Sequence, residues 1–241
     1  IMLCDSGPDL RQEETAVKLL LGRQVDGILI APQNAASLDR LEGPLREVPS
    51  VFLGENLRDR DWNCVSVDNA GGAAMGVEHL YGLGHREILY FGRRRSTTHQ
   101  LRAEGYLGAC EKLGLTPRIF DSPYHRSSPE YGYQLAKELF ERPIDYTAVL
   151  AATDSSALGL LQAADELGIR IPGDLSLVGF DNIPATALPR IELTTVEQPV
   201  RMIAERAVEI LLDKIEQGTP GYVRQILAPK LVLRSSCRPL K

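Results

Sequence analysis

The chain has 241 residues, a formal net charge of −5, and contains 44% hydrophobic and 24% charged residues. This composition is ordinary for a globular protein and supplies enough apolar side chains for one large domain or two small ones. The acidic balance argues against a broad nucleic-acid-binding face on the chain itself, although it leaves a local basic patch open. No apolar run reaches the roughly 18 to 20 residues that span a bilayer, and no basic-then-apolar leader opens the chain, so we expect no membrane contact.

Short apolar runs alternate with helical patterns along most of the chain. They predict strands at 1–4, 27–31, 50–54, 64–67, 87–92, 118–121, 148–153 and 175–180. Because these runs are continuous rather than alternately apolar and polar, they indicate strands covered on both faces, as in parallel sheets. The alternation therefore predicts an α/β fold of right-handed strand–helix–strand units in doubly wound sheets.

Capping residues bound the predicted helices. The pattern places helix starts at Asp68 or Asn69, at Asp154 and at Pro199, and helix stops at Gly82 or Gly84, at Gly168 and at Gly218. After Phe180 the alternation breaks, because a Pro-rich loop and a short strand precede the last long helix.

The sequence lacks the motifs of common enzyme classes: it has no P-loop, no HExxH and no GxSxG. The segment GLGHRE (82–87) lies between a helix end and a strand start, which is the reverse of the order in a dinucleotide site. The four histidines are dispersed. The four cysteines form no CxxC pair, and we expect them to be buried thiols in a reducing cytoplasm. We therefore expect no enzyme, no metal site and no cofactor.

Polar residues follow the strands of the second half of the chain. They are 93–98, 122–128, 153–154 and 181–182. Ligands of open parallel sheets bind beyond the carboxyl ends of the strands, so these residues predict a polar small-molecule cleft.

Several of these residues also have ordinary structural interpretations. Asp181 fits a ligand-binding carboxylate and a turn residue equally well, whereas Asp154 is better explained as a helix N-cap. From the pattern alone, Arg102 is a solvated residue on a helix surface and His85 is a structural histidine. The three arginines at 93–95 favour a solvated turn, although they could attract an anion.

Several longer motifs follow one another along the chain: VDGILIAP, GHREILYFG, LRAEGYLGACEKLGL, LGIRIPGDLSLVGFDN and LTTVEQP. In this order they resemble the effector-sensing domain of the lactose/galactose-repressor (LacI/GalR) family of bacterial transcription regulators. The resemblance covers nearly the whole chain. It implies a periplasmic-binding-protein-like fold of two doubly wound subdomains, joined by three crossing strands near Asp68, Gln198 and Tyr222. The N-terminal subdomain would comprise 1–68 and 198–221, and the C-terminal subdomain 69–197 and 222–241.

The resemblance also implies an effector site. Arg102 matches the arginine that grips effector hydroxyls or carboxylates, and Asp181 matches an effector acceptor. The remaining candidates are Thr98, four residues before the arginine; Thr153, where the family usually has Asn; Ser127, where an aromatic often stacks on the ligand; Asp68 at the first crossing; and Glu55, one residue after the usual acid position.

The implied function is to sense a sugar or similar polar metabolite and to set operator affinity. The resemblance implies that one further strand and helix, and a helix-turn-helix head, lie before these residues, so operator DNA would be bound only through that head. It also implies a cytoplasmic homodimer. A transport-related sugar-binding protein of the same fold is the alternative.

Overall fold

The computed structural model describes residues 1–5, 10–32, 35–54, 57, 60–92, 97–121 and 128–240, with the backbone alone at residues 10 and 35–38. They form two compact units. The first consists mainly of Ile1–Val67 and Pro199–Leu227, and the second of Asp68–Arg95, His99–Gln198 and Ala228–Lys241. Within the described ranges, no helix is both long and apolar enough to cross a membrane.

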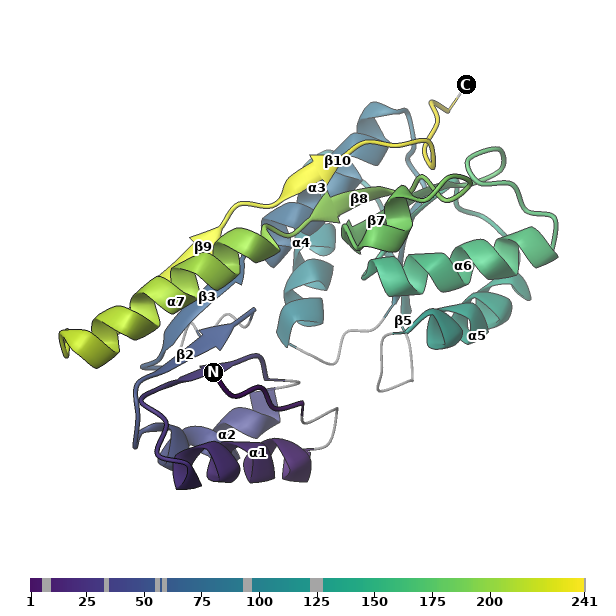
Figure 1. The fold of residues 1–241 in the computed structure, drawn as a ribbon. Helices are drawn as coiled ribbons and strands as arrows, with labels where there is room; N and C mark the ends of the chain where they lie inside the picture. The colour runs from purple at the N-terminus through teal and green to yellow at the C-terminus, as the bar shows by residue number, and fades with distance from the viewer. Residues whose placement is uncertain are drawn as a thin grey trace. The chain divides into compact units, whose positions relative to one another are not determined.

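The first unit is built on a four-stranded parallel sheet with the order β1-β2-β3-β9, of which Figure 1 labels β2, β3 and β9. Its elements are α1 (Leu10–Gly22), β1 (Ile28–Ile30), α2 (Ala35–Leu45), β2 (Ser50–Leu53), β3 (Asn63–Val67), α7 (Val200–Glu216) and β9 (Arg224–Leu227). One core lies between the sheet and α1 and α2, and a second lies where α7 packs its buried Ile203, Ala207 and Ile210 against β2 and β3.

The second unit is built on a six-stranded sheet with the order β10-β8-β7-β6-β4-β5, in which only the β10–β8 pair is antiparallel. Its elements are α3 (Asn69–Gly82), β4 (Ile88–Gly92), α4 (Thr97–Leu113), β5 (Arg118–Asp121), α5 (Pro129–Phe140), β6 (Ala148–Ala151), α6 (Asp154–Glu166), β7 (Ser176–Asp181), the 3-10 helix η1 (Pro184–Ala187), β8 (Thr194–Glu197) and β10 (Lys230–Val232).

Helices cover both faces of this second sheet. Along β6, Val149 faces the core beneath α5 and α6, whereas its neighbour Leu150 faces the core beneath α3 and α4. Successive side chains of a strand point to opposite faces, so a continuous apolar run is required where both faces are covered. The predicted doubly wound α/β architecture is therefore confirmed.

Two sequence predictions about the fold are wrong. Residues 1–4 form no strand: Ile1 and Leu3 are exposed, and no strand ladder of the described residues includes this segment. An apolar run becomes a strand only where a neighbouring strand accepts its backbone hydrogen bonds. The third crossing between the units follows Leu227 and not Tyr222, because β9 pairs with β3 in the first sheet.

The helix starts also differ from the prediction at one position. Asp68 is the N-cap of α3, one of the two predicted residues, and its Oδ1 accepts a hydrogen bond from the Gly71 amide at 2.9 Å. For α6 the N-cap is Thr153 and not Asp154: Thr153 Oγ1 accepts from the Ser156 amide at 3.1 Å. A threonine in extended conformation can cap a helix as Asp does, which releases Asp154 for other contacts.

Candidate functional site

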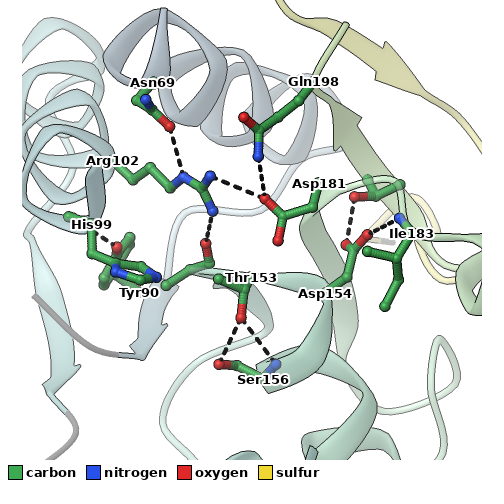
Figure 2. A network of polar contacts seen from close by, with 12 residues as sticks. Asn69, Tyr90, His99, Arg102, Thr153, Asp154, Ser156, Asp181, Ile183 and Gln198 are labelled. Carbon is green, nitrogen blue, oxygen red and sulfur yellow. Dashed lines mark hydrogen bonds and ion pairs between the residues drawn. The ribbon is translucent and has the colours of Figure 1, made fainter. Parts of the chain in front are cut away.

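A polar network lies at the carboxyl ends of the strands of the second unit (Figure 2). At its centre is Arg102, of which 3% is exposed. Its Nε donates to Asn69 Oδ1 at 2.9 Å, and its Nη1 donates to the Ala152 carbonyl at 2.6 Å. Its Nη2 lies 3.0 Å from Asp181 Oδ1. Each nitrogen of the guanidinium therefore has a partner, from α3, from the end of β6 and from the end of β7.

The burial of Arg102 follows from the packing of α4. Arg102, Gly105 and Tyr106 lie on one face of the helix, as the spacing of three and four residues dictates. A Cβ on Gly105 would lie 2.0 Å from the Ala70 carbonyl oxygen, so the absence of a side chain lets α4 approach α3 closely enough for Arg102 to reach Asn69. The guanidinium also lies over the Phe180 ring, with 3.7 Å between its Cζ and the ring centroid. The pattern-based expectation of a solvated Arg102 is wrong.

Asp181 is the exposed member of the pair, with 22% of its side chain accessible. Its Oδ1 takes both recorded contacts, because Gln198 Nε2 also donates to this oxygen at 2.7 Å. The other carboxylate oxygen has no partner among the described residues. The sequence left open whether Asp181 is a ligand-binding or a turn residue; it has features of both, because its φ of 122° and that of 57° at Asn182 form a sharp turn.

Asp154, the first residue of α6, is fully buried without a basic partner among the described residues. Its Oδ1 accepts from the Thr195 hydroxyl at 2.6 Å, and its Oδ2 accepts from the Ile183 amide at 2.9 Å. Burial raises the pKa of this carboxyl to about 6, and the hydrogen bonds from Thr195 and from the Ile183 amide limit the rise.

Of the remaining predicted site residues, three lie within the described residues and two lie outside them. Thr153 lies in the network beside Ala152, and Thr98 is half-buried one helical turn before Arg102. Asp68 bonds within its own capping turn. Ser127 and Glu55 lie outside the described residues, as do the arginines at 93–95.

Sequence reasoning missed other members of the network. It named Asn69 only as an alternative cap, Gln198 only as a crossing point, and Asn182 only as one of the polar residues that follow a strand. The signal was present, because LTTVEQP and GFDN place Gln198 and Asn182 at strand ends. His85 is structural, as expected: it is buried, and its ring nitrogens contact Thr147 Oγ1 at 2.8 Å and Ser176 Oγ at 3.0 Å.

The described residues contain no group of three or more His, Cys, Asp or Glu side chains arranged to hold a metal ion. Of the four free cysteines, Cys64 and Cys110 are buried, whereas Cys4 and Cys237 are half-buried. The network itself offers hydrogen-bonding groups: a guanidinium with further N–H groups, beside a carboxylate with an open oxygen. Such a pair can donate to one hydroxyl of a small molecule and accept from the next.

Comparisons with known proteins place the whole chain in a family. The family described as periplasmic binding protein-like domain matches residues 77–237. The chain is 32% identical to the HTH-type transcriptional repressor PurR of Proteus mirabilis (strain HI4320), over 98% of this chain and 70% of the repressor.

Two solved structures are similar over both units. A LacI family transcriptional regulator from Enterococcus faecium with bound ribose has a TM-score of 0.81 and 26% identity, over 94% of this chain and 85% of that chain. The lac repressor dimer bound to operator and the anti-inducer ONPF has a TM-score of 0.82 and 28% identity, over 95% of this chain and 80% of that chain.

The fold and the site thus define a periplasmic-binding-protein-like small-molecule sensor. The chain belongs to the lactose/galactose-repressor family of bacterial transcription regulators, of which it is the effector-sensing region. This confirms the family, the fold and the regulatory function that the sequence motifs implied, and it disfavours a transport protein.

Proposed function

We propose that the effector is a small neutral sugar, held by Arg102 and Asp181. The observation that carries the proposal is the pairing of these two residues at the strand ends, with one Asp181 oxygen and further Arg102 N–H groups not committed to the described residues. A vicinal pair of hydroxyls offers one donor and one acceptor at matching spacing, and both hydrogen bonds would be charge-assisted.

The ribose bound to the Enterococcus faecium regulator supports a sugar. A strongly anionic ligand is less well matched, because the Arg102 charge is already balanced by Asp181 at 3.0 Å. Five further residues complete the proposed effector site: Thr153, Thr98, Asp68, Ser127 and Glu55. Their hydroxyl and carboxylate groups would distinguish sugars by the positions of the sugar hydroxyls.

Sensing requires that the effector binds two conformations of the regulator with different affinities. A difference of about 1–3 kcal/mol is typical, and it would change operator affinity by the same factor. The HTH-type relative and the operator-bound lac repressor dimer support operator DNA and a second copy of the chain as partners, with DNA bound through a helix-turn-helix part of the regulator. We assign the two units to the two subdomains of the family and place the regulator in the cytoplasm, where operators are. No catalysis is part of this function.

Isothermal titration calorimetry with D-ribose, other pentoses, hexoses and nucleosides tests the proposal. At least one sugar should bind the wild-type protein, and Asp181→Asn should weaken that sugar by about tenfold or more, or about 1.4 kcal/mol. The asparagine keeps the shape of the side chain but replaces the open acceptor oxygen by an N–H group.

Asp145→Asn is the matched control, because Asp145 pairs with Arg118 on the surface and has an exposed side chain. Its sugar affinity should equal that of the wild type. Binding of no panel member, or equal affinity of Asp181→Asn and the wild type, would contradict the proposal.

A further inference from the structure

The turn that carries Asp181 has a backbone that needs external support. Asn182 has a φ of 57°, which asparagine tolerates, but Asp181 has a φ of 122°, where an L side chain is strained. Such a residue keeps its conformation only when the surrounding structure fixes it. The position of the Asp181 carboxylate therefore depends on whatever holds residues 181–183.

Asp154 holds this turn from α6. Its Oδ2 accepts from the Ile183 amide, and its Oδ1 accepts from Thr195 on β8, so one side chain ties α6, the turn and the neighbouring strand together (Figure 2). The fit is close, because a Cβ on Gly179 would lie 2.2 Å from Asp154 Oδ1. A buried carboxylate without a cation is costly, so its place here calls for a positional reason.

Arg234 also holds the turn, from the segment that follows β10. Its Nη2 donates to Asn182 Oδ1 at 2.8 Å, and its Nη1 donates to the Leu193 carbonyl at 2.7 Å and to Thr186 Oγ1 at 3.3 Å. The guanidinium therefore spans the turn, η1 and the start of β8, all through neutral acceptors. A lysine in this place could not make these contacts together, because only the planar fork has donors at the required spacing.

We propose that Asp154 and Arg234 are positioning residues that hold the Asp181 turn in register with Arg102 and thereby set effector affinity. The inference rests on the proposed effector role of Arg102 and Asp181. Neither side chain needs to touch the effector, since each acts through a backbone or side-chain group of residues 182–183.

The chemistry of the contacts predicts which substitutions are tolerated. In Asp154→Asn, the amide oxygen can accept from the Ile183 amide while its N–H group donates to Thr195 Oγ1, whose hydroxyl can turn to accept. Asp154→Ala has neither group. The conservative variant should therefore restore what the alanine variant loses, whereas a role of the negative charge itself would leave both variants impaired.

Calorimetric titration with D-ribose tests the effect on affinity. We expect affinity to fall about tenfold in Asp154→Ala and in Arg234→Lys, and to stay within about threefold of the wild type in Asp154→Asn. Leu139→Ala is the control for simple loss of stability. Leu139 is buried near the end of α5, which runs antiparallel to the parallel strands of the sheet. It therefore lies towards the amino ends of those strands, away from Asp181. The ribose affinity of Leu139→Ala should equal that of the wild type.

The Arg102 Nε–H resonance in ¹⁵N NMR spectra of the sugar-free protein gives a readout that needs no ligand. It should move in Asp154→Ala and Arg234→Lys, and it should stay in place in Asp154→Asn and Leu139→Ala. An unmoved resonance in Asp154→Ala and Arg234→Lys overturns the inference. If the wild type binds neither ribose nor any other sugar, the proposed function fails, and this resonance alone decides the inference.

Discussion

Two arginine–aspartate pairs lie at different places in the second unit and are under different physical demands. Arg102 and Asp181 meet at 3.0 Å at the carboxyl ends of the strands, with side-chain exposures of 3% and 22%. Arg170 and Asp174 meet at 2.5 Å in the loop between α6 and β7, with exposures of 76% and 41%. The second contact is shorter, yet it costs the chain little to make or lose, because water solvates both partners.

The buried pair differs because the polar groups of its arginine must be satisfied within the protein. Arg102 has lost its hydration, and Asn69, the Ala152 carbonyl and Asp181 replace it. In the exposed pair, hydrogen bonds from the Arg170 side chain and amide hold the pKa of Asp174 well below its usual range, but bulk water competes for the same groups. Proximity alone therefore does not indicate which pair matters for function.

The largest effect is expected from Arg102→Ala. The alanine leaves Asn69 Oδ1, the Ala152 carbonyl and the Asp181 carboxylate without the donor that they share. Removing one partner of a buried pair lowers the free energy of unfolding by about 3–5 kcal/mol. Sugar affinity should fall at least about tenfold in the folded protein. Urea denaturation followed by circular dichroism, with calorimetry below the transition, measures both. A variant as stable as the wild type would show that the network is not buried in solution.

Asp154, unlike the aspartates of the two pairs, is a buried carboxylate without a basic partner among the described residues. The pH dependence of stability tests how much its ionised form costs the folded protein. Its pKa in the folded protein is about 6, above the ordinary value of 3.8, so the folded chain binds the proton more tightly than the unfolded chain. The stability that Asp154 contributes is therefore present at low pH and is lost as pH rises from about 4 to about 6. The loss amounts to at most about 3 kcal/mol.

In Asp154→Asn this slope should disappear. The measurement is the difference between wild-type and variant free energies of unfolding at pH 4, 5, 6 and 7. Other titrating groups are the same in both proteins, so they cancel in this difference. The difference should therefore change across the series through the titration of Asp154 alone. A constant difference between the wild type and Asp154→Asn would mean that Asp154 stays ionised throughout.

A smaller effect is expected from Gly105→Ala, which acts on the Arg102 pair through packing. The added Cβ would lie 2.0 Å from the Ala70 carbonyl oxygen, so α4 must move away from α3. Overpacking of this kind costs about 1–3 kcal/mol. Gly108→Ala, on the same helix, is the matched control, because nothing lies within 4 Å of its Cβ. It should gain up to about 1 kcal/mol from helix propensity. Thermal denaturation separates the two variants, and equal melting temperatures would exclude the close approach of α3 and α4.

Much of the fold could be predicted from the sequence because its strands are buried on both faces. Continuous apolar runs such as the one around Val149 leave few alternatives to a parallel strand between two helical layers. The segment at residues 1–4 has the same composition but forms no strand. Pairing depends on a neighbouring strand, which local sequence does not reveal.

The site was less predictable for a similar reason. The helical pattern around Arg102 gave no sign that it is buried, because burial depends on how closely α4 approaches α3, and that is decided by Gly105. Family motifs indicated Arg102 and Asp181, since those residues act directly. They did not indicate Asp154 or Arg234, whose contacts run between segments far apart in the chain and join only in the folded unit.

The smallest effect is expected from Arg170→Ala, which completes the comparison. The variant removes the contact at 2.5 Å, but Asp174 Oδ2 still accepts from the Arg170 amide at 2.8 Å, and water solvates the rest of the carboxylate. The denaturation midpoint should therefore not change measurably at 0.15 M salt, nor should sugar affinity, because this loop lies at the edge of the sheet opposite to Asp181. A loss of stability equal to that of Arg102→Ala would show that the two pairs are equivalent, and that burial does not decide which arginine–aspartate pair stabilises this unit.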